Sequence, residues 1–264
     1  MNYHGIRLPD REEITTPGKK MSEGRNANVY EWGNDRVIKM FKASYPTEKV
    51  TTEYYNAMAV NNLPFKKPKV LELKKTEFGY GIIYEKLSGE NMMDYIERTG
   101  DLKGAAIMMA ELQKSINKCT FDPDSTGALE TVHSILRKNM VESKNAESDA
   151  TKEMIRFLGT MKDGNALCHG NLHPDNVLIA EDGAYAMSAM GYGIGMPLYD
   201  VAKTFFLIAY TPLPGEEKEG STCPACRGIA NTEERKEFGR YYLDNMGKSA
   251  TEIGGYLSMI IAGM

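Results

Sequence analysis

Residues 165–200 decide the fold, and they read NALCHGNLHPDNVLIAEDGAYAMSAMGYGIGMPLYD. Val177-Leu178-Ile179 is a short apolar run of the kind that forms a buried strand. Glu181-Asp182-Gly183 has the composition of a tight turn, and the residues from Ala184 to Met187 can return as the partner strand. The stretch therefore predicts a β-hairpin.

Polar residues lie just before the first strand and just after the second strand of this hairpin. Folding about the Glu181–Asp182 pair sets Asn176 opposite Met187 and beside Ser188. The loop just upstream is dense in polar side chains: His169, Asn171, His173 and Asp175. This order is typical of a catalytic loop that is followed by a metal-binding position.

The N-terminal part of the chain predicts antiparallel strands. Residues 28–32 are rich in strand formers, Gly33-Asn34-Asp35 supplies a turn, and Arg36 to Phe41 is apolar except at Lys39. A lysine in a buried strand needs an anionic partner or a route to solvent. Two further strands are predicted, one beginning at Lys67-Pro68-Lys69-Val70 and one over Gly79 to Glu85.

Residues 46–61 predict a helix between these strands. Pro46 suits its first turn, and Ser44 is the expected cap. Glu53 falls on the same face as the apolar residues Val50 and Ala57. We therefore expect an ion pair between Lys39 and Glu53.

After Gly89 the apolar period changes to that of helices. Three stripes have this spacing: Ala105, Met108, Met109, Leu112 and Ile116; Leu129, Val132, Leu136 and Met140; and Met154, Ile155, Leu158 and Met161. The tail from Thr232 to Met264 also predicts helices. The expected fold is α+β with two lobes, a small, mostly antiparallel β lobe with one helix over residues 1–85 and a larger helical lobe over residues 86–264.

Composition excludes several classes of protein. Lys and Arg number 32 against 36 Asp and Glu, so a nucleic-acid groove is not expected. No apolar run approaches the roughly 18 residues that span a bilayer, and the first residues lack the pattern of a signal peptide. Four cysteines are few for 264 residues, which favours a cytoplasmic protein.

Two motifs carry a resemblance to a known family. The run from His169 to Ile179 resembles the H-G-D-x-x-x-x-N motif of the aminoglycoside phosphotransferase and choline kinase group, which has a protein-kinase-like fold. The run from Gly195 to Ala202 resembles that group's G-D-P-x-x-D-x-A stretch. The resemblance implies ATP as a cofactor and a small-molecule substrate. It also implies that Asp200 braces the catalytic loop through backbone N–H groups.

The same resemblance assigns the remaining site positions. It puts a nucleotide beside Lys39, Glu53, Gly24 and Glu85, and chemistry at Asn171, Asn176 and Ser188. Three family acids are absent, because Asn171 replaces the catalytic aspartate, Ser188 replaces the metal-binding aspartate, and Met196 replaces a third acid. Magnesium prefers anionic oxygens, so weak or absent Mg²⁺ binding is expected, with Asn176 and Asp175 as the remaining ligands.

Three functions stay open at this stage. The first is a nucleotide-binding protein with phosphoryl transfer impaired or lost, a pseudokinase, which would act as a binding or regulatory module and could have a protein partner. The second is an active ATP-dependent phosphotransferase in which Asp175 supplies the missing carboxylate. The third is a scaffold that binds a metabolite without a nucleotide. A membrane partner is not expected in any of the three.

Other conspicuous residues favour plain structural roles. His169 is expected to brace the loop rather than bind zinc, since no four-ligand set is visible. Cys223 and Cys226 form half of a zinc site and are interpreted as free thiols. Four acids of the tail could face a cationic substrate, although solvated faces commonly carry such charges: Glu233, Glu234, Glu237 and Asp244.

Overall fold

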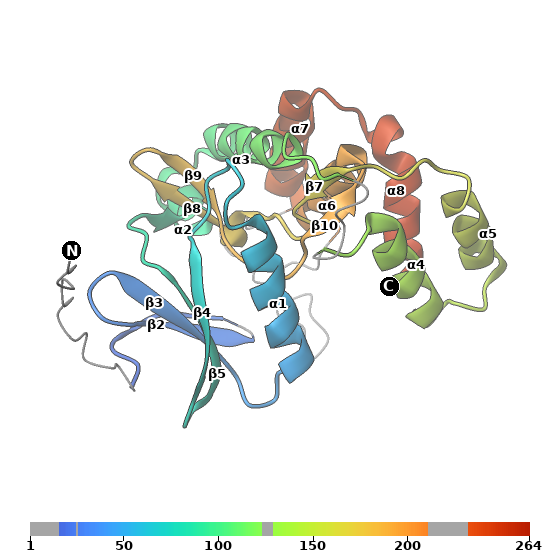
Figure 1. Cartoon of the computed structure of the whole chain (residues 1–264). Helices are drawn as coiled ribbons and strands as arrows, with labels where there is room; N and C mark the ends of the chain where they lie inside the picture. The colour runs from blue at the N-terminus through green and yellow to red at the C-terminus, as the bar shows by residue number, and fades with distance from the viewer. Residues whose placement is uncertain (1–15, 25, 123–128, 211–231) are drawn as a thin grey trace, which may run out of the picture.

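The computed structural model describes residues 16–24, 26–122, 129–210 and 232–264. They form a small lobe, which is a sheet with one helix, and a larger lobe built mainly of helices (Figure 1). The expected α+β class with two lobes is confirmed. Among the helices of the described residues, none is long and apolar enough to cross a membrane.

The small lobe is a five-stranded antiparallel sheet with strand order β1-β2-β3-β5-β4 and with helix α1 beside it (Figure 1). The bounds are β1 Lys20–Glu23, β2 Ala27–Glu31, β3 Arg36–Phe41, α1 Thr47–Val60, β4 Val70–Thr76 and β5 Gly79–Glu85. The expected strands at 28–32, 36–41 and 79–85 and the helix at 46–61 are confirmed to within one residue. Strand β1 was not expected, because it is exposed and carries no apolar alternation.

Strand β3 gives the sheet two different faces. Ile38 and Met40 point to one side, where they are buried against Trp32 and Ile83. Lys39 alternates with them and points to the side of α1, since it reaches Glu53 of that helix. The single lysine of β3 is therefore directed to the face of the sheet that α1 covers.

The expected cap of α1 is wrong. The residue that precedes the helix is Pro46, in an extended conformation, and no side chain caps the first turn. Ser44 lies two residues before the capping position, so its hydroxyl does not occupy the place from which a side chain reaches the second or third helical N–H group. Helix α1 depends on its packing rather than on a cap.

The large lobe holds the remaining elements. Its helices are α2 Met92–Thr99, α3 Leu102–Asn117, α4 Val132–Glu142, α5 Asp149–Leu158, α6 Pro197–Ala209, α7 Thr232–Met246 and α8 Ala250–Ala262. Its strands are β6 Glu90–Asn91, β7 Ala166–Cys168, β8 Val177–Ala180, β9 Gly183–Ala186 and β10 Gly193–Gly195. The three predicted stripes correspond to α3, α4 and α5, and the predicted tail helices to α7 and α8.

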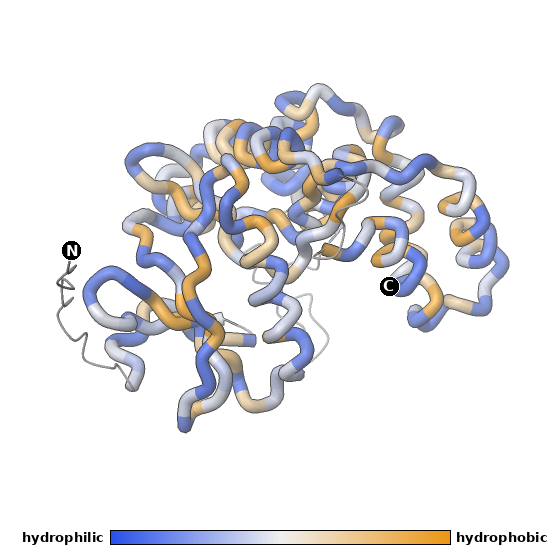
Figure 2. The backbone as a smooth tube through the Cα atoms, viewed as in Figure 1, coloured by the Kyte–Doolittle hydropathy of each residue, from blue (hydrophilic) through white to orange (hydrophobic). Residues whose placement is uncertain are grey.

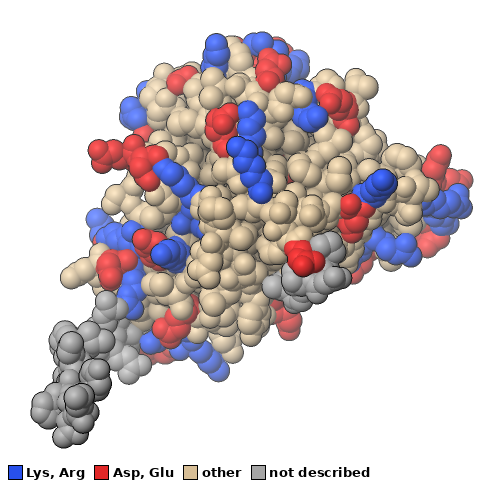
Figure 3. All heavy atoms as spheres, turned by 45° about the horizontal axis from the view of Figure 1, so that its top comes forward, with Lys and Arg blue, Asp and Glu red and all other residues tan. Residues whose placement is uncertain are grey.

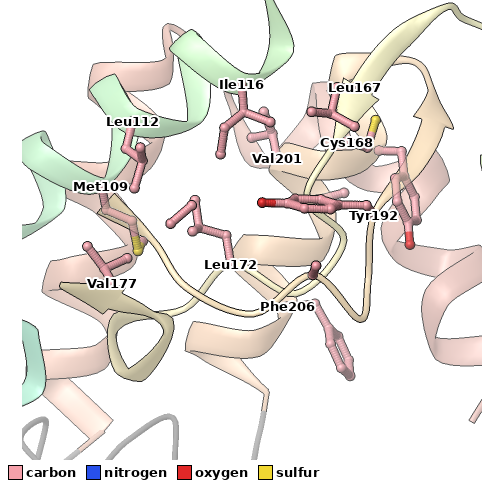
Figure 4. Close-up of a cluster of buried hydrophobic side chains, with 14 of the residues drawn as sticks. Met109, Leu112, Ile116, Leu167, Cys168, Leu172, Val177, Tyr192, Val201 and Phe206 are labelled. Atoms are coloured by element: carbon pink, nitrogen blue, oxygen red, sulfur yellow. The ribbon is translucent and has the colours of Figure 1, made fainter. Parts of the chain in front are cut away.

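One continuous core holds this lobe together. Helix α3 packs against α7, and α6 contacts both α7 and α8. Apolar residues recur between hydrophilic ones along these helices (Figure 2). Figure 4 shows Met109, Leu112 and Ile116 of α3 directed toward Leu172 and Val201. The segment from Leu167 to Leu172 therefore begins inside this buried core.

The predicted hairpin is confirmed in its register. Val177 pairs with Ala186 and Ala180 with Gly183. One step further out, the Met187 N–H donates to the Asn176 carbonyl at 2.8 Å. Asn176 and Ser188 thus lie at the open end of one hairpin, as the turn chemistry predicted.

Candidate functional site

A lysine–carboxylate pair links the sheet to helix α1. The Lys39 Nζ lies 2.5 Å from the Glu53 Oε1, and the Glu53 side chain is only 2% exposed. The Tyr84 hydroxyl donates to the same oxygen at 3.4 Å. The expected ion pair is therefore present, and the Lys39 side chain, 24% exposed, still reaches the surface. Sequence reasoning did not find Tyr84, because nothing in β5 marks its hydroxyl as directed at another element.

Two apolar side chains lie beside Lys39 on the same face of the sheet. Val29 is paired directly with Lys39, and Val37 precedes it by two residues, so all three side chains share one side. Both valines are half-buried, whereas Ile38 on the opposite side is fully buried. This face therefore offers a partly open apolar surface next to a cation.

Helix α1 is tied to the segment that follows Ser188. The Asn56 Nδ2 donates to the Ala189 carbonyl at 3.0 Å, and Asn56 is 7% exposed. This bond holds Glu53, one turn earlier on α1, in register with the loop of the large lobe. Sequence reasoning missed Asn56. The available signal was an amide three residues after Glu53 in an otherwise apolar stripe.

Asp200 braces the loop from behind. Its carboxylate accepts from the backbone N–H of His169 at 3.0 Å and of Gly170 at 2.8 Å. The Asn117 Nδ2 donates to it at 2.9 Å. Burial raises the pKa of Asp200, and these hydrogen bonds act against that rise. The predicted brace is present, and Asn117, at the end of α3, is a partner that the sequence did not indicate.

The two histidines of the loop are buried. The His169 ring meets the Tyr192 ring edge to face at a centroid distance of 5.0 Å. Burial lowers the pKa of His169 to about 4, although the Met187 carbonyl favours its protonated form. Burial also lowers the pKa of His173 to about 3, with His169 adding to the effect. Both rings are neutral near pH 7, as expected for structural residues.

Asn171 and Asn176 share one turn. The Asn176 Nδ2 donates to the Asn171 carbonyl at 2.9 Å and lies 2.9 Å from the His173 Nε2. Its amide nitrogen is thus occupied, and its carbonyl oxygen is the atom left for a ligand. Ser188 follows the other strand of the hairpin with a φ of 70°, in the left-handed region. The structure therefore brings together the three positions that the resemblance marked as chemical.

This donor set does not fit the magnesium that the fold implies. Asn176 and Ser188 offer neutral oxygens, whereas Mg²⁺ in such sites is held by carboxylates. Asp175 is the acid of the same turn, and its backbone carbonyl accepts from Asn91 at 3.0 Å. Within the described residues no group of three or more His, Cys, Asp or Glu side chains is placed to hold a metal ion.

The two other expected nucleotide contacts, Gly24 and Glu85, do not join the Lys39–Glu53 pair. Gly24 is exposed and donates its N–H to the Ala27 carbonyl at 2.9 Å, in the connection between β1 and β2. Glu85 follows Tyr84 at the end of β5, and successive side chains of a strand point to opposite faces. Its carboxylate lines a hollow together with Lys66 and Asp182 and does not join the Lys39–Glu53 pair.

The surface charge follows the balanced composition. Figure 3 shows basic and acidic side chains interspersed over this face of the molecule. On α7, Glu233 is exposed and lies 2.7 Å from Lys236, and Glu237 is exposed as well. Cys223 and Cys226 lie outside the described residues. No large field of one sign marks the described part of this face.

Comparisons with known proteins find the fold but no sequence relative. No family model matches, and no curated protein matches. A thermostable mutant of aminoglycoside phosphotransferase APH(4)-Ia without ligand has a TM-score of 0.63 at 16% identity, covering 95% of this chain and 87% of that one. The GDP and kanamycin complex of APH(2")-IIIa has a TM-score of 0.57 at 13% identity, covering 96% and 84%.

A further neighbour carries two ligands. It is the N202A variant of thermostable APH(4)-Ia in a ternary complex with AMP-PNP and hygromycin B, with a TM-score of 0.62 at 16% identity, covering 92% of this chain and 83% of that one. The fold of this chain is accordingly that of the aminoglycoside phosphotransferases, as the resemblance of its motifs predicted.

Proposed function

We propose that this chain is a nucleotide-binding protein of the kinase-like fold in which phosphoryl transfer is impaired or lost. The observation that carries the proposal is a contrast within one site. Lys39 and Glu53 are paired at 2.5 Å, whereas positions 171 and 188 carry neutral side chains. The lysine that can contact phosphates is retained, but the acids that transfer needs are absent at positions 171 and 188. This contrast points to binding rather than chemistry.

Nucleotide binding is supported by the small lobe. The Lys39 side chain is 24% exposed, so its ammonium can donate to phosphate oxygens, and Glu53 fixes its position. Val29 and Val37 supply the apolar surface on which a base would lie. Structural neighbours were solved with AMP-PNP and with GDP, so adenine and guanine nucleotides both belong in the test.

Loss of transfer is supported by the large lobe. The Asn171 amide can hold a substrate hydroxyl by a hydrogen bond, but it cannot take its proton. Removal of a general base typically costs about 10²–10⁴ in rate. Ser188 cannot replace a carboxylate at the metal position, and this fold depends on charge neutralisation during transfer.

The first experiment is calorimetry with ATP and with GTP, each with and without Mg²⁺. We expect weak binding of at least one nucleotide and little change on adding Mg²⁺. A gain of tenfold or more with Mg²⁺, worth about 1.4 kcal/mol, would contradict the proposal. It would instead favour an active phosphotransferase in which Asp175 holds the metal. No binding of either nucleotide would favour the metabolite-binding scaffold.

The second experiment restores the missing acids. Asn171→Asp alone should do little, and Ser188→Asp alone should recover Mg²⁺-dependent binding with little turnover. The double variant should be the first to release phosphate measurably, because two acids that serve one transition state act non-additively. If the parent already turns over as fast as the double variant, transfer was never lost. A silent double variant would support a site kept for binding alone.

A further inference from the structure

A second hollow lies in the large lobe, apart from the Lys39 site. It has a volume of about 280 Å³ and lies where the end of α3, the start of α6 and the turn between α7 and α8 meet. Its lining residues are Lys114, Asn117, Lys118, Pro197, Leu198, Val201, Met246 and Lys248. None of them is a residue of the proposed nucleotide site.

The hollow is lined by basic side chains and by apolar side chains. Three lysines come from two separate parts of the chain, and no acidic side chain is among the described lining residues. The rest of the lining is mainly apolar, with Leu198, Val201 and Met246 as its largest members. A cavity of this size is at the lower limit of small-molecule sites, which combine an apolar surface with a few placed polar groups.

The ammonium groups differ in how far they are already neutralised. Lys114 lies 2.7 Å from Glu111 and Lys248 lies 3.2 Å from Glu252, both in exposed pairs that contribute little. Within the described residues, Lys118 forms no ion pair. The hollow therefore has three ammonium groups, and that of Lys118 has no acidic partner within the described residues.

We propose that this hollow binds a small organic anion, a carboxylate or phosphate on a short apolar body. The charged group is held by Lys118 and Lys248, and the apolar part lies on Leu198, Val201 and Met246. Asn117 lines the hollow and also donates to Asp200, so the bound anion would sit directly behind the brace of the loop. The proposal does not rest on nucleotide binding.

Calorimetric titration of the full chain with five probes tests this site. The probes are hexanoate, hexyl phosphate, hexanol, hexyltrimethylammonium and inorganic phosphate. We expect the two hexyl anions to bind at least tenfold more tightly than hexanol, the cation or inorganic phosphate. Equal binding of all the hexyl compounds would overturn the proposal, as would failure of both anions to bind at millimolar concentration.

Charge variants locate the binding. Lys118→Glu should weaken both hexyl anions at least tenfold, and Lys138→Glu, the same change on the exposed side of α4, should leave them unchanged. Lys39→Ala should also leave them unchanged, which separates this hollow from the proposed nucleotide site. Equal losses in the Lys118 and Lys138 variants, or loss in the Lys39 variant, would overturn the assignment. Lys118→Met, with the charge removed but not reversed, repeats the test if the glutamate variant does not fold.

Discussion

Asn171 differs from an aspartate only in carrying an amide nitrogen where the acid has a second carboxylate oxygen. That exchange keeps the size and the hydrogen-bonding reach of the side chain but removes its capacity to accept a proton. Ser188 makes the larger change, because a hydroxyl is both shorter and neutral. These two positions differ from the acids by few atoms, so each can be tested by a single substitution.

Lys39 is the residue on which nucleotide binding should depend. Lys39→Ala removes the only lysine of β3 and should weaken ATP or GTP binding at least tenfold, in line with the roughly 1.5–3 kcal/mol of a hydrogen bond to a charged group. Calorimetry measures the affinity. Lys42→Ala, an exposed lysine just past the same strand, is the matched control and should bind as the parent does.

The Lys39→Ala variant must keep its fold for this comparison to hold. Glu53 is buried and loses its partner in Lys39→Ala, so the free energy of unfolding should fall while the circular dichroism spectrum is kept. If the Lys39 variant binds nucleotide as tightly as the Lys42 variant, the phosphates do not lie at Lys39.

Ser188 is the one non-glycine residue with a positive φ within the described residues. The left-handed conformation costs an L-residue with a Cβ about 1–2 kcal/mol relative to glycine. We therefore expect Ser188→Gly to be more stable than Ser188→Ala by about 1 kcal/mol, measured by urea unfolding.

The same pair of changes at a helical site provides the comparison. Ser258 is exposed within α8, where glycine is less stable than alanine by roughly 0.8–1 kcal/mol. The order of the two variants should thus reverse between positions 258 and 188. Alanine being the better residue at both positions would show that the turn after β9 does not hold residue 188 in the left-handed region.

At the scale of elements, α1 is the helix that joins the two lobes at the site. It has no side-chain cap, and it is held by Lys39 on the sheet side and by Ala189 on the side of the large lobe. Such a helix owes its position to a few specific contacts, and each of them can be removed.

Asn56→Ala tests the contact with the large lobe. The change removes the donor from a buried carbonyl, and we expect the free energy of unfolding to fall by about 1–3 kcal/mol. Urea unfolding measures this loss. Asn62→Ala, at an exposed asparagine just after the helix, should change stability by less than about 0.5 kcal/mol. Equal losses in the two variants would mean that the bond from Asn56 to Ala189 does not anchor α1.

At the scale of the whole molecule, stability should depend on acidity through buried His169. Its pKa is about 4 in the folded chain and 6.5 when the ring is exposed. Between these values the unfolded chain binds the extra proton. The contribution of His169 to stability is therefore fully present above pH 6.5 and is lost as the pH is lowered toward 4. The slope from this one group is at most about 1.4 kcal/mol per pH unit, or about 3 kcal/mol in total.

Urea unfolding at pH 7, 6 and 5 measures this slope. His169→Gln should have a slope that is smaller by close to one proton, whatever its absolute stability. Asp200 acts in the opposite direction, because its pKa is raised on folding and its protonation favours the folded chain. An unchanged slope in the glutamine variant would show that the His169 ring is not held neutral.

The sequence by itself determined the elements whose signals are local. The hairpin from β8 to β9 followed from a turn between two apolar runs, and its register placed Asn176 opposite Met187. The alternation in β3 and the spacing in α1 predicted the Lys39–Glu53 pair, because each of these patterns fixes the direction of a side chain within its own element. Asp200 as the brace came from the motif resemblance.

The tertiary structure alone decided what depends on partners far along the chain. Strand β7 has three residues, and its partner β10 comes 25 residues later, so neither carries a pattern of its own. Asn56 bonds to a carbonyl 133 residues away, and Asn117 to a carboxylate 83 residues away. Amides have no periodic signature, because hydrogen bonding depends on which acceptor the folded chain brings within about 3 Å.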